Sequence, residues 1–169
     1  MITRRSWLKT LAILSASQAL PRLSAATGPE RDKLGPLLPQ RVLGKTGLKV
    51  SMLSVGGSHV GRPSEAEAEK IIETAIELGV RTFETAQLYQ NGGSEERYGK
   101  FLTPKYREHV LVFTKTMATD ARTAEEHLNG SLRRMKLDYV DLWQMHDIGS
   151  PEDVDERLRN GVLDFMLKA

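Results

Sequence analysis

The sequence has no cysteine, and its only extended apolar stretch is short. The absence of cysteine excludes a disulfide framework, thiolate catalysis and every zinc site that needs sulfur ligands. Hydrophobic residues make up 40% of the 169 residues and charged residues 27%. These proportions exclude a collagen-like or low-complexity chain and are typical of a globular protein with one domain and a real core.

Basic residues are concentrated at the amino end of the chain. Residues 1–26 hold four basic residues and no acidic one, although the whole chain has a net charge of only +2. Without that segment the chain has 20 basic and 22 acidic residues, a net charge of −2. The body therefore offers no basic surface for nucleic acid, and we expect no nucleic-acid partner.

The amino-terminal segment has the pattern of an export signal. Paired arginines at positions 4 and 5, then Trp7 and Lys9, resemble the twin-arginine signal of bacteria. The following stretch, Leu11–Leu20, is diluted by polar residues and is too short for a stable membrane span, which needs ~20 apolar residues. We therefore predict a twin-arginine signal peptide over residues 1–26 that directs the protein to the periplasm. A basic amphipathic helix is the alternative.

The body of the chain follows a flexible lead-in and repeats a strand–helix unit. Residues 27–39 contain three prolines and are predicted to be a flexible linker. Glycine-bracketed and apolar runs then predict a hairpin at 40–50, strands at 52–55, 80–83, 110–113 and 139–145, and intervening helices. Two Ser/Thr-x-x-Glu patterns, Ser64–Glu67 and Thr123–Glu126, predict capping boxes at helix starts. An open doubly wound sheet and part of a (β/α)₈ barrel both fit this alternation.

Polar residues at the predicted strand ends distinguish these folds. Glu84, Lys115 and His146 each end a different strand and are 31 residues apart in both intervals. Functional groups at the carboxyl ends of successive strands are typical of a barrel active site, and Tyr89 is close enough to join them. Gly56–Gly61 lacks the G-x-G-x-x-G spacing that a doubly wound dinucleotide-binding fold needs. The barrel is therefore the favoured interpretation.

Four segments, in order along the chain, resemble the aldo-keto reductases. They correspond to that family's opening hairpin, second-strand motif with its following helix, third-strand lysine motif and fourth strand. The segments are Arg41–Ser51, Phe83–Tyr89 with Gly93–Glu96, Phe113–Lys115, and Ser131–His146. The resemblance predicts an α/β fold over residues 40–169, namely the N-terminal half of a (β/α)₈ TIM barrel, with about four βα units after the hairpin.

The resemblance also implies a chemistry: NADPH-dependent reduction of the carbonyl of a small aldehyde or ketone to an alcohol by hydride transfer. Tyr89 would be the general acid, and Lys115 would supply positive charge beside its oxygen, because a phenol of pKa ~10 donates a proton poorly. Glu84 would orient Lys115 and touch the cofactor, and His146 would donate a hydrogen bond to the substrate carbonyl. No metal site is predicted. The rival chemistry for a barrel lysine is a Schiff base of the aldolase type.

The sequence departs from the family in two ways. The family's usual acid at position 84 is aspartate, and the extra methylene of Glu84 is expected to move the carboxylate by ~1.5 Å and to retune the site. Residues 27–169 hold four predicted strands, whereas a full barrel has eight in ~250 residues. We therefore expect a truncated chain whose missing half grips the cofactor phosphates. The alternative is a non-catalytic half-barrel that needs a second copy or another chain.

Overall fold

The structure is a computed structural model, and it describes residues 30–169. The predicted signal peptide, residues 1–26, lies outside the described residues. The strands are β1 (Arg31–Asp32), β2 (Gly35–Pro36), β3 (Gln40–Val42), β4 (Lys49–Ser51), β5 (Val55–Gly56), β6 (Thr82–Glu84), β7 (Leu111–Thr116) and β8 (Leu142–Met145). The α-helices are α2 (Glu65–Glu77), α3 (Gly93–Arg97), α4 (Thr103–Tyr106), α5 (Ala121–Met135), α6 (Pro151–Arg159) and α7 (Val162–Met166). Shorter helical turns are η1 (Gly57–His59), η2 (Tyr89–Gly92), η3 (Tyr98–Leu102) and η4 (Arg107–His109).

The central sheet has four parallel strands in the order β5-β6-β7-β8. Sequence order and spatial order coincide, as they do in a barrel, and the predicted half of a (β/α)₈ fold is confirmed. Phe83 of β6 lies beside Val112 of β7. Since all four strands run the same way, their carboxyl ends meet at one edge of the sheet.

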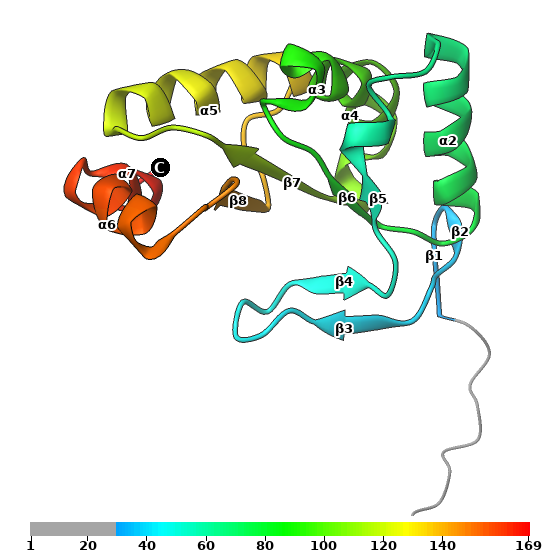
Figure 1. The fold of residues 1–169 in the computed structure, drawn as a ribbon. Helices are drawn as coiled ribbons and strands as arrows, with labels where there is room; N and C mark the ends of the chain where they lie inside the picture. Colours follow the sequence, from blue (N-terminus) through cyan, green and yellow to red (C-terminus); the bar gives the residue numbers. More distant parts are fainter. Residues whose placement is uncertain (1–29) are drawn as a thin grey trace, which may run out of the picture.

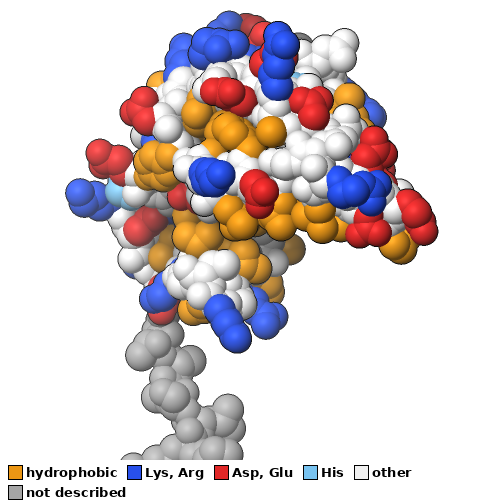
Figure 2. Space-filling view, turned by 90° about the vertical axis from the view of Figure 1, so that its left-hand side faces the viewer, with side chains coloured by type: hydrophobic (Ala, Val, Ile, Leu, Met, Phe, Trp, Pro, Cys, Tyr) orange, Lys and Arg blue, Asp and Glu red, His pale blue; other side chains and the backbone are white. Residues whose placement is uncertain are grey.

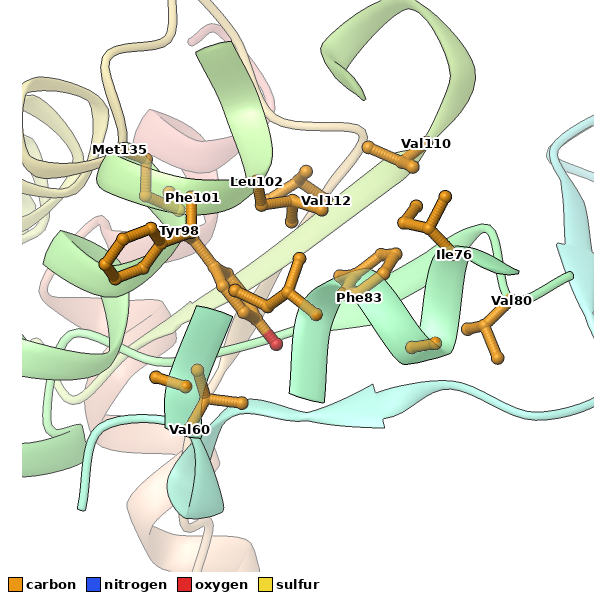
Figure 3. Close-up of a cluster of buried hydrophobic side chains, with 13 residues drawn as sticks. Val60, Ile76, Val80, Phe83, Tyr98, Phe101, Leu102, Val110, Val112 and Met135 are labelled. Carbon is orange, nitrogen blue, oxygen red and sulfur yellow. The ribbon is translucent and has the colours of Figure 1, made fainter. Parts of the chain in front are cut away.

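Helices gather on one side of this sheet. In Figure 1, α3, α4 and α5 lie above the strands, α2 lies at the β5 end, and α6 and α7 lie beyond β8. The main hydrophobic core fills the space between the sheet and α2–α5, with Tyr98 and Phe83 packed edge to face at 5.9 Å (Figure 3). Its buried members include Val60, Ile72, Ile76, Leu102, Val112 and Met135. The core therefore fixes β5, β6 and β7 relative to one another and leaves their carboxyl ends for polar residues.

The predicted opening hairpin is confirmed as β3 and β4, which pair antiparallel and lie below the sheet in Figure 1. Ser51, at the end of β4, attaches the hairpin to β6. Its backbone N–H donates to Oγ1 of Thr82 at 3.0 Å, and its Oγ accepts from the backbone N–H of Arg81 at 3.1 Å. The hairpin is thus held at the amino end of the sheet, away from the carboxyl ends.

Residues 30–39 are the described part of the predicted linker, and they pack against the domain. Asp32 turns the chain between β1 and β2 by accepting from the backbone N–H of Leu34, and it also pairs with the guanidinium of Arg81 at 2.7 Å. Arg81 is 3% exposed, and its hydrogen bonds lower the pKa of Asp32 to about 2. A buried arginine 49 positions away is a partner that local composition does not reveal.

One predicted capping box is confirmed and the other is wrong. Ser64 caps α2, and the Glu67 side chain bonds back to its backbone N–H. α5, however, begins at Ala121, one turn earlier than Thr123 predicts, because Asp120 is the N-cap and its Oδ1 accepts from the backbone N–H of Thr123 at 2.9 Å. Asp is as good an N-cap as Thr, so the Thr123–Glu126 pattern falls inside the first turn.

Within residues 30–169, no helix combines the length and the apolar composition needed to cross a membrane.

Candidate active site

Three strands bring the predicted site residues to one edge of the sheet. Glu84 is the last residue of β6, Lys115 is the second-last residue of β7, and His146 directly follows β8. Tyr89 starts η2 in the loop after β6. The strands begin one to three residues later than the sequence predicts, and β8 ends at the predicted residue. The parallel register places all four residues on the carboxyl side.

Glu84 and Tyr89 both contact the amine of Lys115, and His146 packs against Tyr89. Nζ of Lys115 forms an ion pair with Glu84 and lies 3.2 Å from Oη of Tyr89. It also donates to the backbone carbonyl of Thr85 at 3.0 Å. The ring of His146 stands edge to face with the ring of Tyr89, with centroids 5.4 Å apart. All four side chains are partly buried, so the cluster is shielded but still in contact with solvent.

Burial shifts the ionisation of two members of the cluster. It lowers the pKa of Lys115 to about 8, and the ion pair with Glu84 acts in the opposite direction, because a nearby carboxylate favours the ammonium. Burial also lowers the pKa of His146, and the positive charge of Lys115 adds to this shift. At pH 7 the site therefore holds a charged Lys115 and a neutral His146.

The longer acid at position 84 still reaches Lys115. Its second oxygen, Oε2, lies on the side of Gly56, at the end of β5. The ion pair is thus preserved although the carboxylate is one methylene further from the backbone.

The sequence did not reveal the residues that hold the Tyr89 loop. Thr85 and Ser94 are both fully buried, and their hydroxyl oxygens are 2.8 Å apart. Ser94 also donates to the backbone carbonyl of Gly57 at 2.8 Å. Both residues fall within the family-like segments, but nothing in their spacing indicates that they touch.

A buried carboxylate on the far side of β7 was also missed. Glu95 is 0% exposed, accepts from the hydroxyl of Thr114 at 2.6 Å and pairs with Arg134 at 2.7 Å. It thereby ties α3, β7 and α5 together directly beneath Lys115. Glu96, its neighbour in the sequence, is exposed, and the two glutamates are indistinguishable by pattern.

Within residues 30–169, no group of three or more histidine, aspartate or glutamate side chains is arranged to hold a metal ion.

Comparison with known proteins agrees with this geometry. The model of the Aldo/keto reductase family matches residues 52–165, which include the whole parallel sheet and all four site residues. The chain belongs to this family. The match follows the same strands and helices on which the sequence resemblance rests.

A relative in Bacillus subtilis, named uncharacterized oxidoreductase YrpG, is 32% identical over an alignment of 152 positions that covers 73% of this chain and 47% of that protein. A solved structure assigned to the aldo-keto reductases, from Pseudomonas aeruginosa, is 30% identical with a TM-score of 0.68, covering 76% of this chain and 53% of that one. A Bombyx mori aldo-keto reductase in complex with NADP shares the fold at 23% identity and a TM-score of 0.57, covering 74% and 47%. The chain thus spans about half the length of the relatives that it matches.

Proposed function

We propose that this chain is the N-terminal half of an NADPH-dependent oxidoreductase that reduces the carbonyl of small aldehydes or ketones to alcohols. The observation that carries the proposal is the contact of Tyr89 Oη with Lys115 Nζ at 3.2 Å, next to the ion pair of Lys115 with Glu84. A phenol beside a shielded ammonium can give up its proton, because the charge stabilises the phenolate that remains.

Each residue has a step in this reaction. Tyr89 donates its proton to the carbonyl oxygen as negative charge develops there. Lys115 holds the resulting phenolate, and Glu84 keeps Lys115 charged and oriented. His146, neutral at pH 7, donates one hydrogen bond to the same substrate oxygen and sets its angle.

The side chains present fit the reactive end of the cofactor. Nδ1 of His146 is buried without a hydrogen-bond partner among the described residues. A polar group of the substrate or cofactor can therefore form a hydrogen bond with this nitrogen. Glu84 has acceptor oxygens for a cofactor hydroxyl or amide. Reduced nicotinamide, when bound, supplies the hydride. The NADP-bound Bombyx mori neighbour supports the choice of cofactor. We assign the binding of the cofactor phosphates to the second half of the barrel.

The test is carbonyl-dependent oxidation of NADPH by the full-length protein, measured as a function of pH. Because Lys115 must be charged, the rate is expected to fall as the pH rises through about 8, where burial places the pKa of Lys115. Below that value the ammonium is present and the rate should be flat until other groups titrate. Lys115→Arg, which stays charged, should remove the fall at high pH. No NADPH oxidation with any aldehyde or ketone of a broad panel would refute the proposal.

The second candidate is a non-catalytic half-barrel completed by another chain, and an apolar groove beside β8 favours it. The groove has a volume of about 370 Å³ and is lined by α5, β8, α7 and the segment before β8, through residues such as Leu128, Leu132, Trp143, Leu163 and Met166. Figure 2, seen from the side of α6 and α7, shows hydrophobic side chains in an interrupted band between charged ones. Light scattering and the binding of a hydrophobic dye together test this second candidate on the 169-residue chain. A monomer that binds no dye would exclude the need for a partner.

We also propose export to the periplasm by the twin-arginine route. It rests on the sequence of residues 1–26, and replacing Arg4 and Arg5 by lysine should retain the protein in the cytoplasm. Fractionation of the source cells tests this, and an unchanged periplasmic yield would contradict it.

A further inference from the structure

The loop that carries Tyr89 is closed at its base by two buried hydroxyl groups. It leaves the sheet at Thr85, directly after β6, and rejoins the domain at Ser94, the second residue of α3. Both side chains are 0% exposed, and their oxygens are 2.8 Å apart. The contact therefore joins the two ends of the loop with no solvent between them.

The direction of each hydrogen bond follows from the number of protons. A hydroxyl has one proton to donate and can accept from two directions. Ser94 donates its proton to the backbone carbonyl of Gly57, 2.8 Å away, so it must accept from Thr85. The result is a directed chain from Thr85 to Ser94 to Gly57, which links the residue after β6 to α3 and to the start of η1.

Thr85 is also a direct partner of Lys115. Its backbone carbonyl accepts from Nζ of Lys115 at 3.0 Å, and its backbone N–H donates to the carbonyl of Phe113 in β7 at 2.8 Å. The side chain of Thr85 thus closes the loop while its main chain holds the amine that Tyr89 touches.

We propose that Thr85 and Ser94 form a clasp, the Thr85–Ser94 hydroxyl pair, that positions Tyr89 against Lys115. Neither side chain is placed at the reacting atoms, so both are positioning residues. Their role as parts of a reductase rests on the proposed function, whereas their effect on the contact between Tyr89 and Lys115 does not.

The backbone of the loop shows why a clasp is needed. Gln90, Asn91 and Gly92 have φ values of 51°, 53° and 93°, so three successive residues after Tyr89 lie in the left-handed region. Side chains disfavour this region, and such a run persists only where its surroundings impose it. Without the Thr85–Ser94 hydroxyl pair, the loop is free to relax towards right-handed turns and to carry Tyr89 with it.

The Thr85–Ser94 hydroxyl pair is tightly packed against Gly57. A Cβ added to Gly57 would lie 2.6 Å from the carbonyl oxygen of Glu84 and 2.7 Å from Oγ of Ser94. The start of η1 therefore packs directly against the pair, and glycine is required because any side chain would displace it. The clasp and the ion pair of Glu84 with Lys115 lie on consecutive residues of the same segment.

The proposal is tested on the 169-residue chain with Thr85→Val, which keeps the shape of the side chain and removes its hydroxyl. The readout is the titration of Lys115, followed by NMR with [ε-¹³C]lysine and assigned through Lys115→Arg. In the unaltered chain we expect a midpoint near 8. Thr85→Val and Ser94→Ala should raise the midpoint by about one pH unit towards the ordinary value of ~10.4, because an opened loop lets water reach the amine.

Two variants separate positioning from stability. Thr103→Val is the matched control, since Thr103 is also buried and its Oγ1 donates to the carbonyl of Met135 at 2.6 Å, on the other side of the core. It should cost similar stability and leave the Lys115 titration where it was. Thr85→Ser keeps the hydroxyl and should restore the midpoint to within about 0.3 of the unaltered chain.

The outcomes are distinct. If Thr85→Val lowers the melting temperature as Thr103→Val does and leaves the Lys115 midpoint unchanged, the hydroxyl pair only stabilises the fold and the proposal is overturned. If Ser94→Ala does not fold, Thr85→Val and Thr85→Ser still decide. The experiment uses no cofactor, carbonyl or turnover, so a protein inactive in the reductase assay can still confirm or refute the clasp.

Discussion

Under the proposed function, Tyr89→Phe is expected to lower kcat for carbonyl reduction by the full-length protein by about 10²–10⁴-fold, the range that general acids contribute. The substitution removes the proposed proton donor, the hydroxyl of Tyr89, and leaves the ring, with its edge-to-face contact to His146, in place. The affinity for NADPH should stay near normal, because the phenol oxygen lies against Lys115 and its proposed partner is the substrate and not the cofactor. Steady-state kinetics with a cofactor-binding titration would measure both quantities.

Tyr139→Phe is the matched control for this experiment. Tyr139 is 60% exposed, and its ring lies under the guanidinium of Arg107 at 4.1 Å, remote from the carboxyl ends of the strands. Loss of its hydroxyl should leave kcat unchanged. An active Tyr89→Phe enzyme would end the role of Tyr89 as the acid, and equal losses in both variants would indicate a general defect.

Arg134→Met is expected to give the largest loss of stability, about 3–5 kcal/mol in the free energy of unfolding. The variant leaves Glu95, which is 0% exposed, with the hydroxyl of Thr114 as its remaining side-chain partner. A buried carboxylate without its cation carries a large cost of desolvation. Arg134 is partly exposed, so the penalty arises at Glu95 and not at the arginine.

The neighbouring Arg133→Met is the control for this prediction, because Arg133 is exposed on the same helix and should change stability little. Unfolding by denaturant, followed by circular dichroism, compares the two. The double variant Glu95→Leu with Arg134→Met should recover part of the loss, since it removes both charges at once. Similar stability of Arg134→Met and Arg133→Met would show that the pair contributes nothing.

Local pattern determined much of this protein. Apolar spacing and turn residues predicted the hairpin, the four parallel strands and the start of α2 at Ser64, because these depend on contacts within a few residues. The equal spacing of Glu84, Lys115 and His146 predicted that they would meet, since parallel strands of one sheet bring their carboxyl ends together whatever the helices between them are. The family resemblance was carried by the same segments.

Where two neighbouring residues are equally suited to one position, the sequence alone did not show which of them occupies it. Asp120 and Thr123 are both good helix caps, and only the packing of α5, with the backbone of Ala121 bonded to the carbonyl of Asn160, selects the first. Glu95 and Glu96 occupy the same helix turn, and the position of β7 decides which one is buried.

Tertiary structure alone decided the partners that hold the site in place. The bond of Thr85 with Ser94 requires the Tyr89 loop to close, and the pairing of Asp32 with Arg81 joins residues 49 positions apart. For each of these side chains, the residues next to it in the sequence do not indicate its partner. The reason is that a hydrogen bond depends on distance in space and not on spacing along the chain. The sequence by itself therefore predicted which residues would lie at the carboxyl ends of the strands, and the folded chain decided how closely Tyr89, Lys115 and Glu84 approach.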